Sequence, residues 1–241
     1  MAATARGIGR GQSKVLGSRS KPDLGWLSAV TGRSVSDVEA SLSGLDVGSG
    51  PVAELVGRIM GSGRAYYAQF PAPLDLYSLV VLTKPKTVVE SGVASGVSSA
   101  FILMGIRSNR RGVLHSIDLP VARRSGGRNP SWAVPAGGDS GWAVPNALRR
   151  GWDLRRGRSE DLLKPLLGEI GGLDFFCHDS PVDEDHFRFE MQAIVPHLGP
   201  GSLVVADNTD WDMFERTAGS VGTRALRRRN SSLGAFRVPK G

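Results

Sequence analysis

A glycine-containing turn is the feature that most constrains the fold of this chain. Residues 87–99 read TVVESGVASGVSS, in which a β-branched run is followed by Glu90, by Gly92 and Gly96, and by small residues that lead into an apolar stretch. A buried strand that ends at Glu90, turns on two glycines and feeds a helix beginning near Val97 places backbone N–H groups beside one carboxylate. This pattern predicts a binding site for a cofactor that carries a nucleoside.

The spacing of the glycines narrows the choice of cofactor. A dinucleotide fingerprint has the pattern G-x-G-x-x-G, which lets the backbone approach a pyrophosphate. Here the pattern is E-x-G-x-x-x-G-x-S, and this spacing of the glycines does not match a pyrophosphate-binding turn. A second apolar run, residues 113–117, ends in Asp118, and a carboxylate at the tip of the neighbouring strand can bind both ribose hydroxyls of an adenosine. An aspartate in this position can also cap a helix, so the glycine turn and Asp118 together are stronger evidence for a nucleoside site than either feature alone.

With these motifs, roughly residues 70–240 resemble the class I S-adenosylmethionine-dependent methyltransferases. Within that class the chain is similar to small-molecule O-methyltransferases such as catechol O-methyltransferase and the macrolide-sugar O-methyltransferases. The resemblance implies an α/β fold with a Rossmann-like, mostly parallel seven-stranded sheet, helices on both faces and S-adenosylmethionine as cofactor. The residues that it assigns to the cofactor are Glu90, Gly92, Ala94, Gly96 and Ser98 in the turn, Asp118 at the ribose, Ser159 and Glu160 at the adenine, and Asp179.

The adenine assignment depends on the segment GRSEDLL, residues 157–163, which resembles the family's loop after the third strand. Ser159 and Glu160 are its candidate contacts. The same residue types in this order also open helices, with a serine as N-cap and acids in the first turn. Both interpretations are open from the sequence.

Oxygen-bearing side chains follow two further predicted strands. LDFFCHDS places Asp179 after the fourth strand, and SLVVADN places Asp207 and Asn208 after the fifth. Carboxylate and amide oxygens suit Mg²⁺, and the resemblance to catechol O-methyltransferase implies that these three residues bind it. The ion would lower the pKa of a substrate hydroxyl and align its oxygen for methyl transfer. In the alternative, the acids cap helices or contact the cofactor without a metal.

The family's general base has no counterpart in this sequence. Three residues after the first metal-binding acid, where relatives have a lysine or a histidine, this chain has Val182. We therefore consider His186 as the catalytic base, together with Asp179 as a catalytic residue, although His186 is equally explained as an exposed helix residue. His178 is expected to orient a neighbour, and Trp211 either lines the acceptor pocket or anchors its helix.

Length and composition limit the organisation of the chain. With 241 residues, of which 40% are hydrophobic, the chain supports one sizeable core rather than two domains. Its only cysteine, Cys177, allows no disulfide within the chain. No apolar run approaches the roughly 18 to 20 residues of a membrane span, so a cytoplasmic protein is expected. We predict a disordered basic tail over 1–22, an N-terminal helical cover over 23–70 and the cofactor-binding domain over 71–241.

Hydrophobic periodicity places the elements of this organisation. We expect helices over 23–30, 34–42, 51–60, 73–82, 97–107, 160–168, 184–197 and 211–218, and strands over 87–90, 113–117, 153–156, 173–177 and 202–206, with a closing antiparallel hairpin at the end of the chain. Such alternation implies a mostly parallel sheet. Residues 120–146 break the pattern with two copies of Trp-Ala-Val-Pro, at Trp132 and Trp142. This segment either closes over the active site or is an insertion that packs on the surface.

The net charge of +7 suggests nucleic acid as a partner. The basic residues gather in the tail and in two short clusters, however, and no RNA-recognition motif with aromatic residues accompanies them. A hydroxylated small molecule is therefore the favoured acceptor. An RNA methyltransferase and a non-catalytic subunit that binds S-adenosylmethionine are the alternatives, and homo-oligomerisation is left open.

Overall fold

The computed structural model describes residues 21–63, 70–119, 134–135, 138–180, 184–207 and 212–240. Within them, seven strands form one sheet in the order β3-β2-β1-β4-β5-β7-β6. The first five strands are parallel, β7 pairs antiparallel with β5, and β6 pairs antiparallel with β7. The predicted fold class is confirmed.

The observed elements follow the predicted alternation closely. The strands are β1 (Thr87–Ser91), β2 (Val113–Asp118), β3 (Trp152–Arg156), β4 (Leu173–His178), β5 (Leu198–Ala206), β6 (Leu226–Arg227) and β7 (Gly234–Arg237). The helices are α2 (Leu24–Thr31), α3 (Val35–Ser43), α4 (Gly50–Gly61), α5 (Pro73–Thr83), α6 (Val97–Asn109), α7 (Ser159–Ile170), α8 (Glu184–Ile194) and α9 (Asp212–Ser220), with 3₁₀ turns η2 (Asn146–Leu148) and η3 (Val195–His197). Residues 1–20 of the predicted tail, which covers 1–22, lie outside the described residues.

One helix is shorter than predicted. The expected helix over 184–197 ends at Ile194 and continues as the 3₁₀ turn η3. Pro196 lacks the N–H that an α-helix needs at that position, and its ring would contact the carbonyl four residues earlier. The proline therefore ends α8 one turn early.

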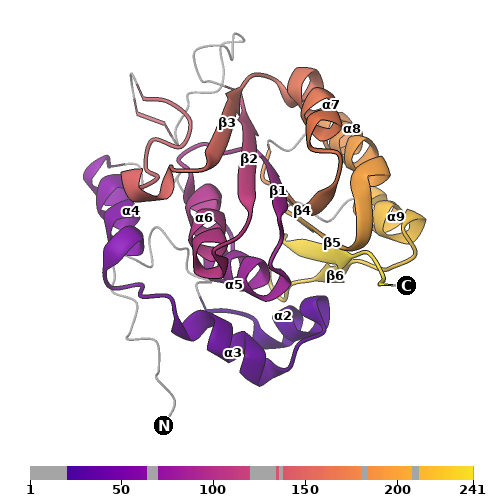
Figure 1. Ribbon diagram of the computed structural model, residues 1–241, viewed down its shortest axis with the longest axis horizontal. Helices are drawn as coiled ribbons and strands as arrows, with labels where there is room; N and C mark the ends of the chain where they lie inside the picture. Colours follow the sequence, from indigo (N-terminus) through magenta and orange to yellow (C-terminus); the bar gives the residue numbers. More distant parts are fainter. Residues whose placement is uncertain are drawn as a thin grey trace.

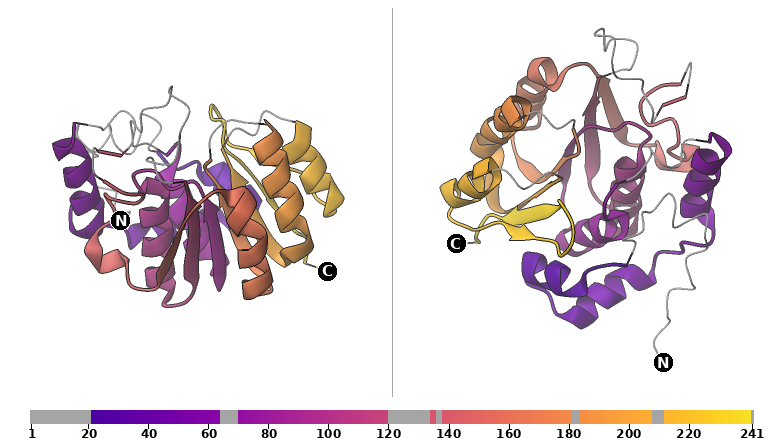
Figure 2. Two further views of the ribbon diagram at one scale, coloured as in Figure 1. Left: turned by 90° about the horizontal axis from the view of Figure 1, so that it is seen from above. Right: turned by 180° about the vertical axis from the view of Figure 1, so that it is seen from behind.

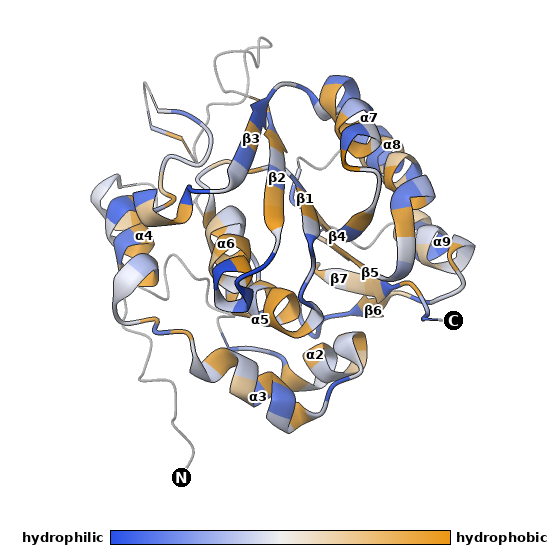
Figure 3. Ribbon diagram, in the orientation of Figure 1, coloured by the Kyte–Doolittle hydropathy of each residue, from blue (hydrophilic) through white to orange (hydrophobic). Residues whose placement is uncertain are grey.

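Two layers of helices enclose the sheet (Figures 1 and 2). Helices α5 and α6 cover one face, and α7, α8 and α9 cover the other. Because successive strand residues point to opposite faces, Val88 of β1 belongs to the first hydrophobic core and Val89 to the second. Apolar residues accordingly fill the central strands, while the outer helix surfaces are polar (Figure 3).

The N-terminal helices share the first core with α5 and α6. Trp26 of α2 donates a hydrogen bond from Nε1 to the carbonyl oxygen of Leu226, at 2.8 Å. Asp75 of α5 and Arg228, which follows β6, form an ion pair at 3.2 Å, and their side chains are only 1% and 5% exposed. Arg228 also donates to the carbonyl oxygen of Lys21. These contacts join the start of the described chain to its closing hairpin.

The buried ion pair generates a prediction on stability. Arg228→Ala would leave Asp75, whose pKa is already raised by burial, without its cation. We expect the free energy of unfolding to fall by about 3 to 5 kcal/mol, measured by urea denaturation. Arg216→Ala, which removes an exposed pair with Asp212, should change it by less than about 1 kcal/mol. Equal effects of the two substitutions would contradict the prediction.

Candidate active site

A pocket of about 240 Å³ lies at the carboxyl edge of the sheet, where β1 and β2 end and α7 begins. Ligands of open α/β sheets bind where the strand order reverses, and here the order reverses at β1, which lies between β2 and β4. The predicted cofactor residues that line the pocket are Gly92, Asp118, Ser159 and Glu160, and His186 joins them. The structure thus brings together side chains from four separate segments of the chain.

The glycine turn passes unusually close to the end of β4. Gly92 has φ of +85°, and a Cβ atom there would lie 2.2 Å from the carbonyl oxygen of Asp179. The Gly92 N–H donates to Ile117 at 2.9 Å, and the Asp179 N–H donates to Ser91 at 2.8 Å. Only glycine satisfies both the backbone angle and the spacing.

The rest of the turn leads directly into α6. Gly96, with φ of +90°, is the N-cap residue of this helix, and Ala94 also has a positive φ of 48°. A Cβ atom on Gly96 would lie 2.4 Å from Cγ2 of Val144. The start of α6 is therefore held close to the end of β1, as the sequence predicts.

Glu90 is completely buried beneath the turn. Ser99 and Ser116 each donate a hydrogen bond to its Oε2 atom, at 2.6 Å. Burial raises the pKa of Glu90 to about 7. Within the part of the chain that the structure describes, neither Oε1 of Glu90 nor Oγ of Ser98 has a hydrogen-bond partner. Ser98 nevertheless lies close enough to the Glu90 and Asp179 carboxyls to lower the pKa of each, and neither Glu90 nor Ser98 is among the described residues that line the pocket.

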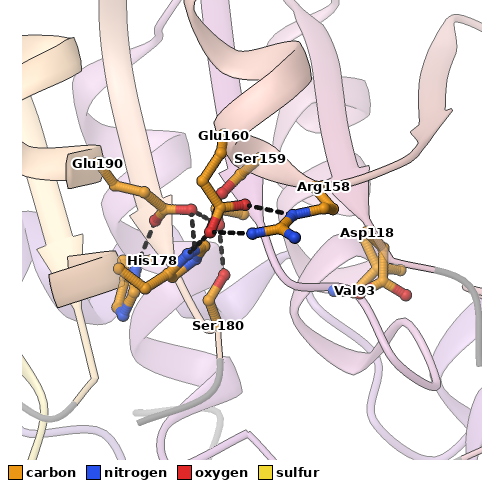
Figure 4. Close-up of polar contacts among 10 residues, drawn as sticks. Val93, Asp118, Arg158, Ser159, Glu160, His178, Ser180 and Glu190 are labelled. Carbon is orange, nitrogen blue, oxygen red and sulfur yellow. Dashed lines mark hydrogen bonds and ion pairs between the residues drawn. The ribbon is translucent and has the colours of Figure 1, made fainter. Parts of the chain in front are cut away.

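Asp118, at the end of β2, lies beside the turn with both carboxylate oxygens engaged. The Val93 N–H donates to Oδ1 at 3.2 Å (Figure 4), and Ser140 Oγ donates to Oδ2. Asp118 is 8% exposed and lines the pocket. The carboxylate is thus fixed in orientation at the place predicted for a ribose.

The segment predicted to contact adenine forms another wall of the pocket. Helix α7 begins at Ser159, and its N-cap is Arg158, which makes no side-chain capping bond. Ser159 therefore does not have the N-cap role that the sequence left open. Its Oγ lies 3.3 Å from Nε2 of His186, and Glu160 Oε1 lies 3.1 Å from Nδ1 of the same imidazole.

His186 links this wall to helix α8. Its Nε2 atom lies 3.0 Å from Oε1 of Glu190, one turn along the helix. Glu190 is buried and also accepts from Ser91 Oγ and from Nδ1 of His178, the latter at 2.7 Å. Burial opposes the charge of Glu190, but the bonds from His178 and His186 outweigh it and hold the pKa of Glu190 well below its usual range. Figure 4 shows that Glu190, His178, Ser159 and Glu160 lie close together.

The contacts of His186 decide its protonation state. The hydrogen bond to Glu190, reinforced by Glu160, raises the pKa of His186 to about 9. With both ring nitrogens facing carboxylates, the imidazolium has no lone pair for a substrate proton. The geometry favours a cation that joins α7 to α8 over a general base.

The predicted metal ligands are described only in part. Asp179 follows β4 and Asp207 follows β5, and Ser232 donates a hydrogen bond to Oδ1 of Asp207. Desolvation, followed by the negative charge of Asp207, raises the pKa of Asp179 well above its usual range. Asn208, Val182 and Trp211 lie outside the described residues. Among the residues that are described, no group of three His, Cys, Asp or Glu side chains could hold a metal.

Two parts of the site were missed in the sequence. Glu190 stands four residues after His186, a spacing that places both residues on one helix face. The contact between them could therefore have been predicted from the sequence. No sequence pattern predicts the hydrogen bond from Ser140 to Asp118, because Ser140 belongs to the irregular segment between β2 and β3.

Comparisons with known proteins agree with this geometry. A family model described as a methyltransferase domain matches residues 89–209, half of the chain, and the chain belongs to this family. The resemblance to S-adenosylmethionine-dependent methyltransferases is thereby confirmed. No curated protein matches the sequence.

Solved structures of low sequence identity share the fold. Cofactor-bound Rv0187 from MTB is 17% identical, with 85% of this chain and 97% of that chain covered and a TM-score of 0.54. Apo CalS11, a TDP-rhamnose 3′-O-methyltransferase in calicheamicin biosynthesis, is 16% identical, with coverage of 84% and 94% and a TM-score of 0.49. The O-methyltransferase from Bacillus cereus in complex with SAH is 15% identical, with coverage of 94% and 99% and a TM-score of 0.47.

The described helices are all too short or too polar to cross a membrane.

The close approach of the glycine turn to β4 can be tested by one methyl group. Gly92→Ala should weaken binding of S-adenosylhomocysteine by about tenfold or more, because the positive φ and the contact with Asp179 each oppose a side chain. Isothermal titration calorimetry measures this. Gly172→Ala adds the same methyl group where no heavy atom lies within 4 Å, and should bind like the wild type. Unchanged affinity of Gly92→Ala would refute the steric argument.

The raised pKa of His186 predicts how stability depends on pH. A pKa raised from 6.5 to about 9 means that the stabilisation by His186 is complete below about pH 6.5 and is lost as the pH rises through about 9. The difference in unfolding free energy between wild type and His186→Gln should therefore shrink over this range. Arg188→Gln, on the same helix, removes a cation that stays charged throughout, so its effect should not vary with pH. A constant difference for His186→Gln would contradict the prediction.

Proposed function

We propose that this chain transfers the methyl group of S-adenosylmethionine to a hydroxyl oxygen of a small molecule. The observation that carries the proposal is the pocket at the reversal of strand order, with Asp118 on one side, the glycine turn at its base and the start of α7 opposite. Its chemistry suits an adenosyl group, because a carboxylate can bind a ribose diol while backbone amides approach closely at glycine.

We assign different residues of the pocket to different parts of the cofactor. We assign the ribose hydroxyls to Asp118 and the adenine to the wall of Ser159 and Glu160. We place the methionine part of the cofactor against the glycine turn, which lines the pocket at Gly92. His186 serves as a positioning residue that fixes the adenine wall against α8.

The acceptor site is proposed beside the ends of β4 and β5. Asp179 immediately precedes Ser180, which lines the pocket, and it adjoins Gly92 through its backbone. We propose that Asp179 contacts the acceptor hydroxyl, which puts the reacting oxygen next to the cofactor cleft. This arrangement achieves catalysis chiefly by holding the two reactants in line.

The charges of two neighbouring carboxylates support a divalent cation at this place. Asp179 and Asp207 are close enough for the charge of one to raise the pKa of the other, and a divalent cation relieves such repulsion. We propose that Asp179, Asp207 and Asn208 hold Mg²⁺. The ion, when bound, would lower the pKa of the acceptor hydroxyl. The LVVADN motif after β5 supports this proposal.

Methyl transfer to a panel of hydroxylated small molecules, with Mg²⁺ or with EDTA, tests the proposal. We expect transfer that EDTA abolishes, and we expect calorimetry to detect S-adenosylhomocysteine binding in both conditions. Asp207→Asn should lower activity by about 10- to 100-fold while it leaves that binding unchanged. Asp212→Asn, an exposed acid on α9, is the matched control.

The results of this experiment test the cofactor assignment and the metal site separately. An absence of heat with S-adenosylhomocysteine would overturn the cofactor assignment. Full activity of Asp207→Asn in EDTA would overturn the metal site and leave the cofactor assignment standing.

A further inference from the structure

The segment between β2 and β3 packs directly on the glycine turn. The Gly141 N–H donates to the carbonyl oxygen of Ala94 at 2.8 Å, and the Ala143 N–H donates to that of Ser95 at 3.1 Å. Val144 is fully buried and occupies the space in which a Cβ atom of Gly96 would lie. The second Trp-Ala-Val-Pro copy therefore packs against the glycine turn and is not a surface insertion.

Basic side chains anchor this segment from the outside. Arg58 of α4 donates to the Val144 carbonyl at 2.9 Å, and Arg149 donates to the carbonyls of Val144 and Gly141, at 3.2 and 2.5 Å. Arg149 also lies over the ring of Trp152, 5.5 Å from its centroid. Irregular backbone must satisfy its carbonyl groups individually, and here cations do so, which fixes residues 140–144 in place.

The anchored segment delivers one side chain to the site. Ser140 is 3% exposed, and its hydroxyl donates to Oδ2 of Asp118. Among the described residues that line the pocket, Asp118 is present and Ser140 is not. The serine therefore reaches the carboxylate from the protein side, while the Val93 N–H holds the other oxygen.

We propose that Ser140 is a positioning residue for the cofactor ribose, which acts by orienting the carboxylate of Asp118. Two oxygen atoms that bind a diol must keep a fixed plane, and one donor on each oxygen provides that constraint. The inference rests on the proposed role of Asp118 at the ribose. It gives the described segment 138–145 a function in cofactor recognition.

Ser140→Ala tests this proposal through the ribose itself. Calorimetry should show about tenfold weaker binding of S-adenosylhomocysteine, the loss typical of a hydrogen bond to a charged group. The 2′-deoxy analogue of the same ligand should lose less than about threefold, because its contact with Asp118 is already reduced. Ser202→Ala removes another buried serine hydroxyl, which bonds Leu173 at the far end of the sheet, and should not change binding of either ligand.

The outcomes separate this inference from the proposed function. Equal losses for the two ligands would mean that Ser140 only stabilises the segment, and unchanged binding would mean that it has no role; either result overturns the inference. Asp118→Asn examines the underlying assignment. If Asp118→Asn binds S-adenosylhomocysteine as the wild type does, Asp118 does not bind the ribose, and the inference about Ser140 is wrong as well. Weaker binding in Asp118→Asn together with wild-type binding in Ser140→Ala would refute the inference alone.

Discussion

The contact between Gly92 and the carbonyl of Asp179 is the constraint on which the site depends. It brings the turn after β1 against the residue that follows β4, with no room for a side chain between them. Because β1 and β4 are neighbours where the strand order reverses, this contact sets the distance between the cofactor pocket and the proposed acceptor site. A methyltransferase needs that distance fixed, since its two reactants must lie in line.

Several acidic side chains lie at this edge of the sheet, and hydrogen bonds from neighbouring groups stabilise them. Glu90 accepts from two serines, Asp118 from Ser140 and the backbone, and Glu190 from two histidines. Each hydrogen bond offsets part of the cost of burying a carboxylate. Burial and then the charge of Asp207 raise the pKa of Asp179. This pairing of two carboxylates is the physical reason to propose a cation at Asp179.

Elements with a regular hydrophobic period were predictable, and irregular ones were not. The strand over 87–90 and the helix over 97–107 were found nearly as predicted, because buried β-branched runs and apolar helix faces leave local patterns. The division into tail, cover and domain, and the individual site assignments, stay predictions. The contact of His186 with Glu160 could not be predicted, because Glu160 lies on another helix and its approach is set by packing.

The sequence by itself determined the class of fold and the place of the glycine turn, since the alternation of strands and helices and the positions of glycines are local properties of the chain. Only the tertiary structure decided that His186 is held as a cation between two carboxylates and that Ser140 reaches Asp118. The physical reason is that hydrogen bonds between distant segments depend on how the helices and the irregular segment pack against the sheet. No spacing along the chain records that packing.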